Sequence, residues 1–135
     1  MLPESIPTAA GAMILVVDDL IDGAEVLVKL LRRTGYPADI AIGGDDLFAY
    51  LVSHDADSPA LIILDVAMPH VDGIECLRRL RDDSRWRNVP VIMYTADSSH
   101  ARQSQAAALG VRDYVVKGAT RWPDFAAMIG RYVRP

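Results

Sequence analysis

Short apolar runs alternate with longer segments of helical periodicity along nearly the whole chain. Strand-like runs occupy residues 13–17, 38–42, 60–64, 89–95 and 113–117, and helix-like segments occupy residues 21–35, 45–54, 72–83, 99–110 and 123–133. The run at 60–64 carries no polar residue, which is typical of a strand buried on both faces, whereas 38–42 alternates as strands near an edge do. Strict alternation of this kind predicts an α/β fold with a parallel sheet and helices on both faces.

The bulk composition describes one globular domain. The chain has 135 residues, of which 51% are hydrophobic, and its formal net charge of −4 argues against direct nucleic-acid binding. Cys76 has no partner for an internal disulfide, which fits a reducing compartment. Because no signal peptide or membrane span is recognisable, we expect a cytoplasmic protein without membrane contact. Residues 1–12 are expected to form a flexible tail or linker, and residues 13–135 the folded domain.

Polar residues follow the predicted strands where each strand ends. Asp18 and Asp19 follow the first strand, Asp65 the third and Thr95 the fourth, and Lys117 ends the fifth. The carboxyl ends of parallel strands meet at one edge of a sheet, where ligands bind. Two carboxylates about 4 Å apart repel by roughly 4 kcal/mol at an effective dielectric of about 20. Lys117 supplies one counter-charge, and hard oxygen ligands suit Mg²⁺ as the second.

Such a cluster suits phosphoryl transfer. Asp65 can act as an oxygen nucleophile and form an acyl phosphate. Mg²⁺, Lys117 and the hydroxyl of Thr95 would then stabilise the equatorial oxygens in the transition state.

These segments resemble the receiver domains of two-component response regulators. The motifs "ILVVDD", "DVAMPHVDG", "VIMYTA" and "DYVVKG" occur in the family's order, and the match runs from about residue 13 to 133. The steps of 46, 30 and 22 residues from Asp19 to Asp65, Thr95 and Lys117 are similar to the family's spacing. The resemblance implies a doubly wound, flavodoxin-like sheet of five parallel strands in the order 2-1-3-4-5.

The resemblance also implies roles for individual residues. Asp65 would accept a phosphoryl group from a phosphohistidine on a sensor histidine kinase or histidine phosphotransfer protein. Asp18, Asp19, Asp65 and the backbone carbonyl of Ala67 would hold Mg²⁺, and Lys117 would pair with Asp65 and then with the phosphoryl group. Thr95 and Tyr114 would act as the switch that remodels the surface of the fourth helix, fifth strand and fifth helix for a downstream effector. Such a domain catalyses only its own phosphorylation and dephosphorylation, so it is not expected to be an enzyme in the usual sense.

The chain departs from the family pattern in places. Gly118 follows Lys117 where the family usually has proline, often after a cis bond, so we expect either a trans bond with an altered loop or a cis bond tolerated by glycine. Ala67 and Asp97 occupy positions that tune loss of the phosphoryl group in the family, with no direction implied here. The last helix begins late, after Trp122 in a loop, so the effector surface is expected to be unusual.

Other interpretations remain open. Asp18 and Asp19 could simply cap the first helix, and Tyr114 could be a packing residue. Leu20 and Ile21 could form an exposed apolar patch for a partner or pack in the core. The domain could be a degenerate receiver that serves only as an interaction module. A Mg²⁺-dependent phosphatase of the haloacid-dehalogenase type also uses an aspartate nucleophile, but that class needs a second Asp where this chain has Ala67.

Overall fold

The computed structural model describes residues 13–54 and 57–134, so the tail expected over residues 1–12 lies outside the described residues. The elements are β1 (Ile14–Val17), α1 (Ile21–Arg33), β2 (Ala38–Ala41), α2 (Gly44–Ser53), β3 (Leu61–Leu64), α3 (Gly73–Asp82), β4 (Val91–Thr95), α4 (His100–Ala108), β5 (Asp113–Val116) and α5 (Trp122–Ile129). Among these described elements, no helix is both long enough and apolar enough to cross a membrane.

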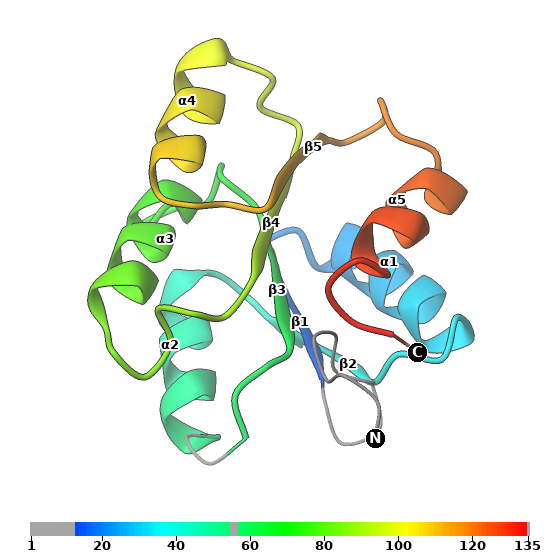
Figure 1. Cartoon of the computed structure of the whole chain (residues 1–135), viewed down its shortest axis with the longest axis horizontal. Helices are drawn as coiled ribbons and strands as arrows, with labels where there is room; N and C mark the ends of the chain where they lie inside the picture. Colours follow the sequence, from blue (N-terminus) through cyan, green and yellow to red (C-terminus); the bar gives the residue numbers. More distant parts are fainter. Residues whose placement is uncertain (1–12, 55–56, 135) are drawn as a thin grey trace, which may run out of the picture.

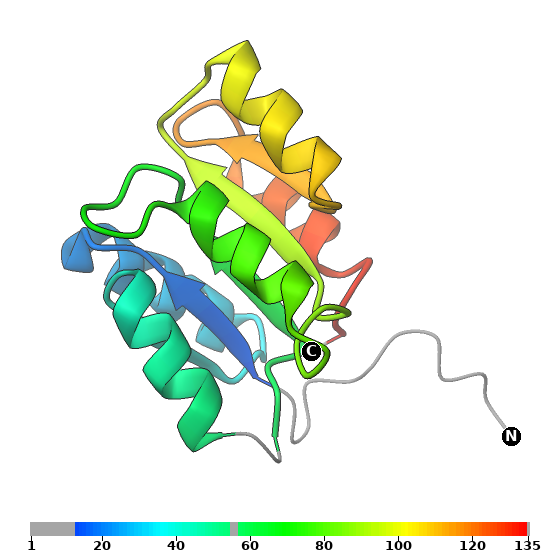
Figure 2. The ribbon, with the colours of Figure 1, turned by 90° about the vertical axis from the view of Figure 1, so that its left-hand side faces the viewer.

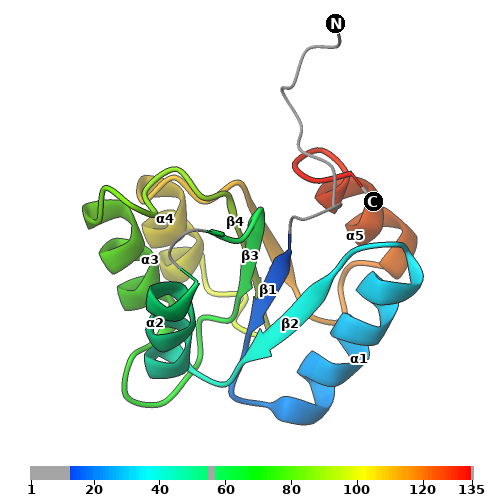
Figure 3. The same cartoon turned by 90° about the horizontal axis from the view of Figure 1, so that it is seen from below.

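The strands form one parallel sheet in the order β2-β1-β3-β4-β5. Helices α1 and α5 cover one face, and α2, α3 and α4 cover the other (Figures 1 and 3). The doubly wound fold and the edge position of the second strand are therefore confirmed. The arrangement places the carboxyl ends of β1, β3, β4 and β5 at one edge of the sheet.

Each face of the sheet has its own hydrophobic core, because successive strand residues point to opposite faces. Figure 2 shows α2, α3 and α4 side by side in front of one face. The strand residues buried beneath these three helices are Leu15, Val17, Ala41, Ile62, Leu64, Val91 and Met93. Those buried against α1 and α5 are Ile14, Val16, Ala38, Leu61, Ile63, Ile92 and Val115. The central strands are thus buried on both faces, and a polar residue has room only at their ends.

The last helix differs from the prediction at both ends. It begins at Trp122, which we expected in a loop, and ends at Ile129 rather than at residue 133. Pro123 suits the first turn of a helix and allows the earlier start. Gly130 is a weak helix former, and beyond it the chain turns so that Val133 is fully buried in the core. Tyr132, which lies just beyond the end of this helix, is only partly buried.

The connection from β3 to α3 is tightly held next to Asp65. Asp72 caps α3 by accepting a hydrogen bond from the Glu75 N–H at 2.8 Å. The N–H of Gly73 donates to the carbonyl of Val66 at 2.8 Å. A Cβ atom on Gly73 would lie 2.0 Å from the carbonyl oxygen of Asp65. The sequence motif identified this stretch as a helix start, but its close approach to Asp65 is visible only in the structure.

His70, in the same connection, adopts a left-handed backbone conformation with φ of 65°. Such a conformation costs a residue with a Cβ about 1–2 kcal/mol. Since the side chain is exposed, replacing His70 with glycine should raise the free energy of unfolding by about 0.5–1 kcal/mol after glycine's own entropy loss. Urea denaturation measures the change. His70→Ala is the matched control: it keeps the Cβ, and an equal gain in that variant would contradict the explanation.

Candidate functional site

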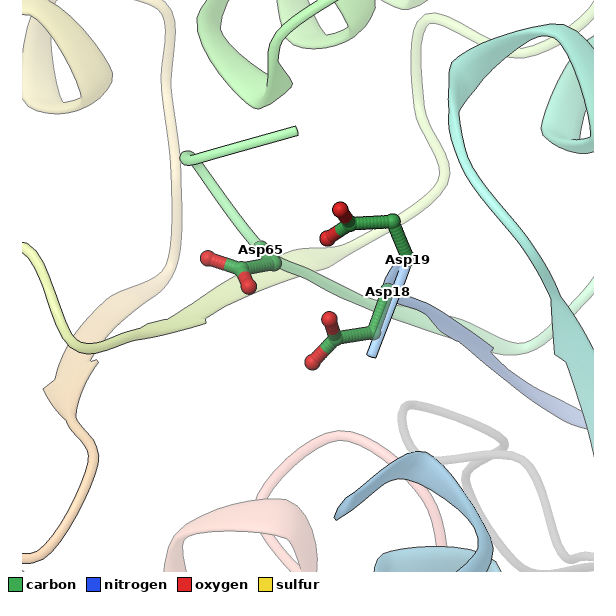
Figure 4. Close-up of side chains that lie close together, drawn as sticks. All are labelled: Asp18, Asp19 and Asp65. Carbon is green, nitrogen blue, oxygen red and sulfur yellow. The ribbon is translucent and has the colours of Figure 1, made fainter. Parts of the chain in front are cut away.

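Three aspartates meet beyond the carboxyl ends of β1 and β3. The two strands are neighbours with Val17 opposite Leu64, so Asp18 and Asp19 emerge next to Asp65. Figure 4 shows the three carboxylates close together at this edge, and one oxygen from each lies within 4.8 Å of the others. Asp18 and Asp65 are each only 4% exposed. We call these three residues the acidic cluster.

Backbone hydrogen bonds orient two of the three carboxylates. Asp18 Oδ1 accepts from the Leu20 N–H at 3.0 Å, and Asp65 Oδ1 accepts from the Ala67 N–H at 3.2 Å. The N-cap residue of α1 is Leu20, which has no side-chain cap, so the aspartates do not serve as the helix cap. Asp19 Oδ1 is buried and has no hydrogen-bond partner within the described part of the chain. A buried carboxylate oxygen without a partner is costly, and a cation bound to the acidic cluster would satisfy it.

Lys117 reaches the acidic cluster from the end of β5. Its ammonium donates to Asp18 Oδ2 at 2.7 Å and to Asp65 Oδ2 at 3.2 Å. Burial by itself would lower the pKa of Lys117, but the hydrogen bonds and charges of Asp18 and Asp65 outweigh it, and the pKa is raised. Lys117 also lies over the Tyr94 ring, 5.6 Å from its centre, a contact that sequence reasoning missed.

The loop after Lys117 follows one of the two expected alternatives. The bond between Lys117 and Gly118 is trans, and Gly118 has φ of 82°, which glycine adopts without strain. The Lys117 N–H donates to the Thr95 carbonyl at 2.8 Å, which ties the end of β5 to the end of β4.

Thr95 and Tyr114 are linked through the connection between β4 and α4. Thr95 is fully buried, and its Oγ1 accepts from the Asp97 N–H at 3.2 Å. The Tyr114 hydroxyl donates to the Asp97 carbonyl at 2.6 Å. Burial, followed by the charges of Asp97 and Asp65, raises the pKa of Tyr114. Thr95 and Tyr114 therefore both form side-chain hydrogen bonds to the backbone of Asp97, in the loop between β4 and α4.

Three further residues that the sequence analysis named, a cysteine and two apolar residues, are also placed by the structure. Cys76 is fully buried, and burial raises the pKa of its thiol to about 12, which makes it unreactive. Leu20 and Ile21 are 62% and 39% exposed, so they are surface residues beside the acidic cluster rather than core residues.

The charges of the site favour a divalent cation. Three carboxylates against one ammonium leave a formal charge of −2, and one carboxylate oxygen has no hydrogen-bond partner among the described residues. All the ligand atoms offered by the side chains are hard oxygens, which suit Mg²⁺. The residues present therefore fit the cation that the sequence predicts.

Comparisons of the sequence and of the structure with known proteins all point to the same family of domains. A family model described as the response regulator receiver domain matches residues 14–122. The sensor kinase/phosphatase CqsS of Vibrio cholerae is 33% identical over 109 residues, 80% of this chain and 16% of CqsS. The chemotaxis protein CheY of Pseudomonas aeruginosa is 36% identical over 107 residues, 79% of this chain and 85% of CheY. The crystal structure of a response regulator receiver protein from Pseudomonas putida has a TM-score of 0.83 at 25% identity, covering 92% of this chain and 99% of that one.

Several relatives are much longer than this chain. The match spans 16% of CqsS, 23% of the response regulator PleD of Caulobacter vibrioides and 41% of the regulatory protein ResD of Bacillus subtilis. The similarity to these proteins therefore concerns one domain and not their complete architecture.

Proposed function

This chain belongs to the family of response regulator receiver domains, and on that premise we propose that Asp65 is its phosphoacceptor. The observation that carries the assignment is the position of Asp65: it lies in the acidic cluster, with Lys117 donating to one of its oxygens. In the reaction, an Asp65 carboxylate oxygen attacks the phosphorus of a phosphohistidine. The new O–P bond forms as the N–P bond breaks, and the imidazole keeps the bonding electrons and takes up a proton.

The surrounding residues stabilise the charge that is transferred. The Lys117 ammonium, already 3.2 Å from Asp65 Oδ2, is placed to neutralise phosphoryl oxygens. Asp18, Asp19, Asp65 and the backbone carbonyl of Ala67 would hold Mg²⁺. When bound, that ion supplies the positive charge that Lys117 alone cannot, and it offsets repulsion between the acids and the incoming group.

The switch in this proposal is the loop between β4 and α4. A phosphoryl group on Asp65 offers the Thr95 hydroxyl an acceptor, in place of its present role as acceptor for the Asp97 N–H. Tyr114 is bound to the carbonyl of the same Asp97, so movement of the loop frees or repositions the Tyr114 ring. The surface of α4, β5 and α5 thereby changes for an effector.

The remaining assignments rest on the same family membership. The phosphoryl donor is a sensor histidine kinase or a histidine phosphotransfer protein in the cytoplasm, and this chain itself contacts neither nucleic acid nor membrane. Its only catalysis is its own phosphorylation and dephosphorylation. The domain covers residues 13–135, which is supported by the complete burial of Val133 beyond the last helix.

Phosphorylation by a small donor tests the proposal. The full chain is incubated with Mg²⁺ and acetyl phosphate, and intact mass spectrometry should show one added phosphoryl group that Asp65→Asn abolishes. Asp82→Asn, which removes an exposed acid at the end of α3, is the matched control and should be phosphorylated normally. Absence of an adduct would indicate a degenerate interaction module, and rapid multiple turnover of acetyl phosphate would indicate a phosphatase.

Asp19→Asn should distinguish a role of Asp19 in binding Mg²⁺ from a role in stabilising the fold. Without Mg²⁺ the variant should be more stable than the wild type by about 1 kcal/mol, because one of three crowded charges is removed. Wild type should gain about 2.7 kcal/mol with Mg²⁺ at about 100 times its Kd, and the variant should lose most of this gain. Urea denaturation with and without Mg²⁺ measures both effects. A variant that is stabilised by Mg²⁺ as strongly as wild type would remove Asp19 from the metal site.

A further inference from the structure

An open groove of about 560 Å³ lies at the amino ends of the strands, opposite the acidic cluster. It is lined by the segments that precede β3, β4 and β5, around Ala60, Pro90 and Arg112, and by Arg131 and Tyr132 after α5. These segments lie at the amino ends of the strands, whereas the acidic cluster lies at their carboxyl ends. The groove is therefore separate from the phosphorylation site.

The groove is positively charged although the chain is acidic overall. Three arginines line it, Arg85, Arg112 and Arg131, and no aspartate or glutamate lines it among the residues that the structure describes. Asp83 pairs with Arg85 at 2.8 Å. Arg112 and Arg131 have no carboxylate within 4.0 Å in the described part of the chain. Asp113, next to Arg112 in the sequence, accepts a hydrogen bond from the Tyr132 hydroxyl at 2.6 Å.

The walls of the groove are held in place by a fourth arginine. Arg81 of α3 donates to the carbonyls of Arg87 and Val89 before β4, and to those of Leu109 and Gly110 before β5. Burial first, and then the nearby charge of Arg112, lowers the pKa of Arg81. Arg81 thus links the two loops by hydrogen bonds. The arginines of this region repel one another, and a bound anion would reduce this repulsion.

The lining defines the kind of anion. One guanidinium group can donate two parallel hydrogen bonds to the oxygens of a phosphate. Asn88 adds a side-chain amide to the lining of the groove. The rest of the wall is apolar, with Pro59, Ala60 and Val89, and with the Tyr132 ring, whose centre lies 6.0 Å from the Arg112 guanidinium carbon. The volume lies in the range of small-molecule sites, about 300–1,000 Å³. We propose that this groove binds a nucleoside phosphate, with its phosphates on Arg112 and Arg131 and its planar base against the apolar wall.

Binding of ADP to the full chain tests the proposal. Calorimetric titration is performed without Mg²⁺ and at low ionic strength, so that the acidic cluster does not contribute and surface charges are not screened. Arg112→Gln and Arg131→Gln should each weaken binding at least about tenfold, and the double variant should abolish it. Arg33→Gln, at an exposed position at the end of α1, is the matched control and should bind like wild type. Phosphorylation of Asp65 by acetyl phosphate should be normal in all four variants, which shows that they are folded.

Two further probes identify the recognised chemistry. Pyrophosphate and adenosine, titrated separately, should each bind at least about tenfold more weakly than ADP if phosphate and base are both recognised. Amide NMR shifts on adding ADP should be confined to the segments around Ala60, Pro90 and Arg112 and to Arg131 and Tyr132 after α5. No binding of ADP, or equal binding by the double variant, would overturn the site. Equal affinity for pyrophosphate and ADP would overturn the nucleoside part of the proposal.

Discussion

Replacing Gly73 with alanine is expected to destabilise the fold by at least about 3 kcal/mol and to disrupt phosphorylation of Asp65. The added Cβ would lie 2.0 Å from the Asp65 carbonyl oxygen and 2.8 Å from the Val66 Cα. Both are backbone atoms, so no side-chain rotation can relieve the clash. The connection after β3 must therefore move, and Asp65 moves with it. Urea denaturation and the acetyl phosphate assay measure the two effects.

Gly23→Ala is the matched control for this substitution. Gly23 lies in α1, and a Cβ there would have no atom within 4 Å. Alanine is the better helix former by about 0.8–1.0 kcal/mol, so this variant should be more stable than wild type. If Gly73→Ala retained wild-type stability and phosphorylation, the close approach would not constrain Asp65 as we infer.

Lys117→Met should have the second large effect. The substitution leaves the acidic cluster without the ammonium that donates to Asp18 and Asp65. Removing one partner from a largely buried ion pair is expected to cost about 2–3 kcal/mol of unfolding free energy at neutral pH. Phosphorylation by acetyl phosphate should be lost or strongly slowed, because the phosphoryl oxygens lose their cation.

The direction of the Lys117 pKa shift predicts how the stabilisation by this residue depends on pH. The pKa is raised above its ordinary value of 10.5, so the stabilisation is fully present below that pH. It is lost as the pH rises through the higher folded-state value, and the difference between wild type and Lys117→Met should shrink there. Lys29→Met is the matched control, since Lys29 is exposed on α1 and its loss should alter neither stability nor phosphorylation. A difference that stays constant as the pH rises well above 10.5 would contradict the assigned charge pairing.

The fold was predictable because its signals are local. Apolar runs such as Leu61–Leu64 differ in periodicity from amphipathic segments such as Ile21–Arg33, and parallel sheets restrict the possible connections. The strand-end positions of Asp19, Asp65 and Lys117 followed directly from that pattern. The end of α5 was less predictable, because the chain leaves the helix at Gly130 to bury Val133 in a core made by distant residues.

The detailed geometry of the site depends on contacts between residues far apart in the chain. Sequence spacing indicated that Lys117 meets Asp65, but the shorter contact is with Asp18. Asp19 Oδ1 is the carboxylate oxygen of the acidic cluster that has no hydrogen-bond partner in residues 13–54 and 57–134. Nothing in the spacing of Arg85, Arg112 and Arg131 indicates that they line one groove. Periodicity records which side of a strand or helix a residue faces, whereas side-chain distances arise from the packing of whole elements. The chain order thus predicts which residues share an edge of the sheet, and folding alone decides which of their atoms touch.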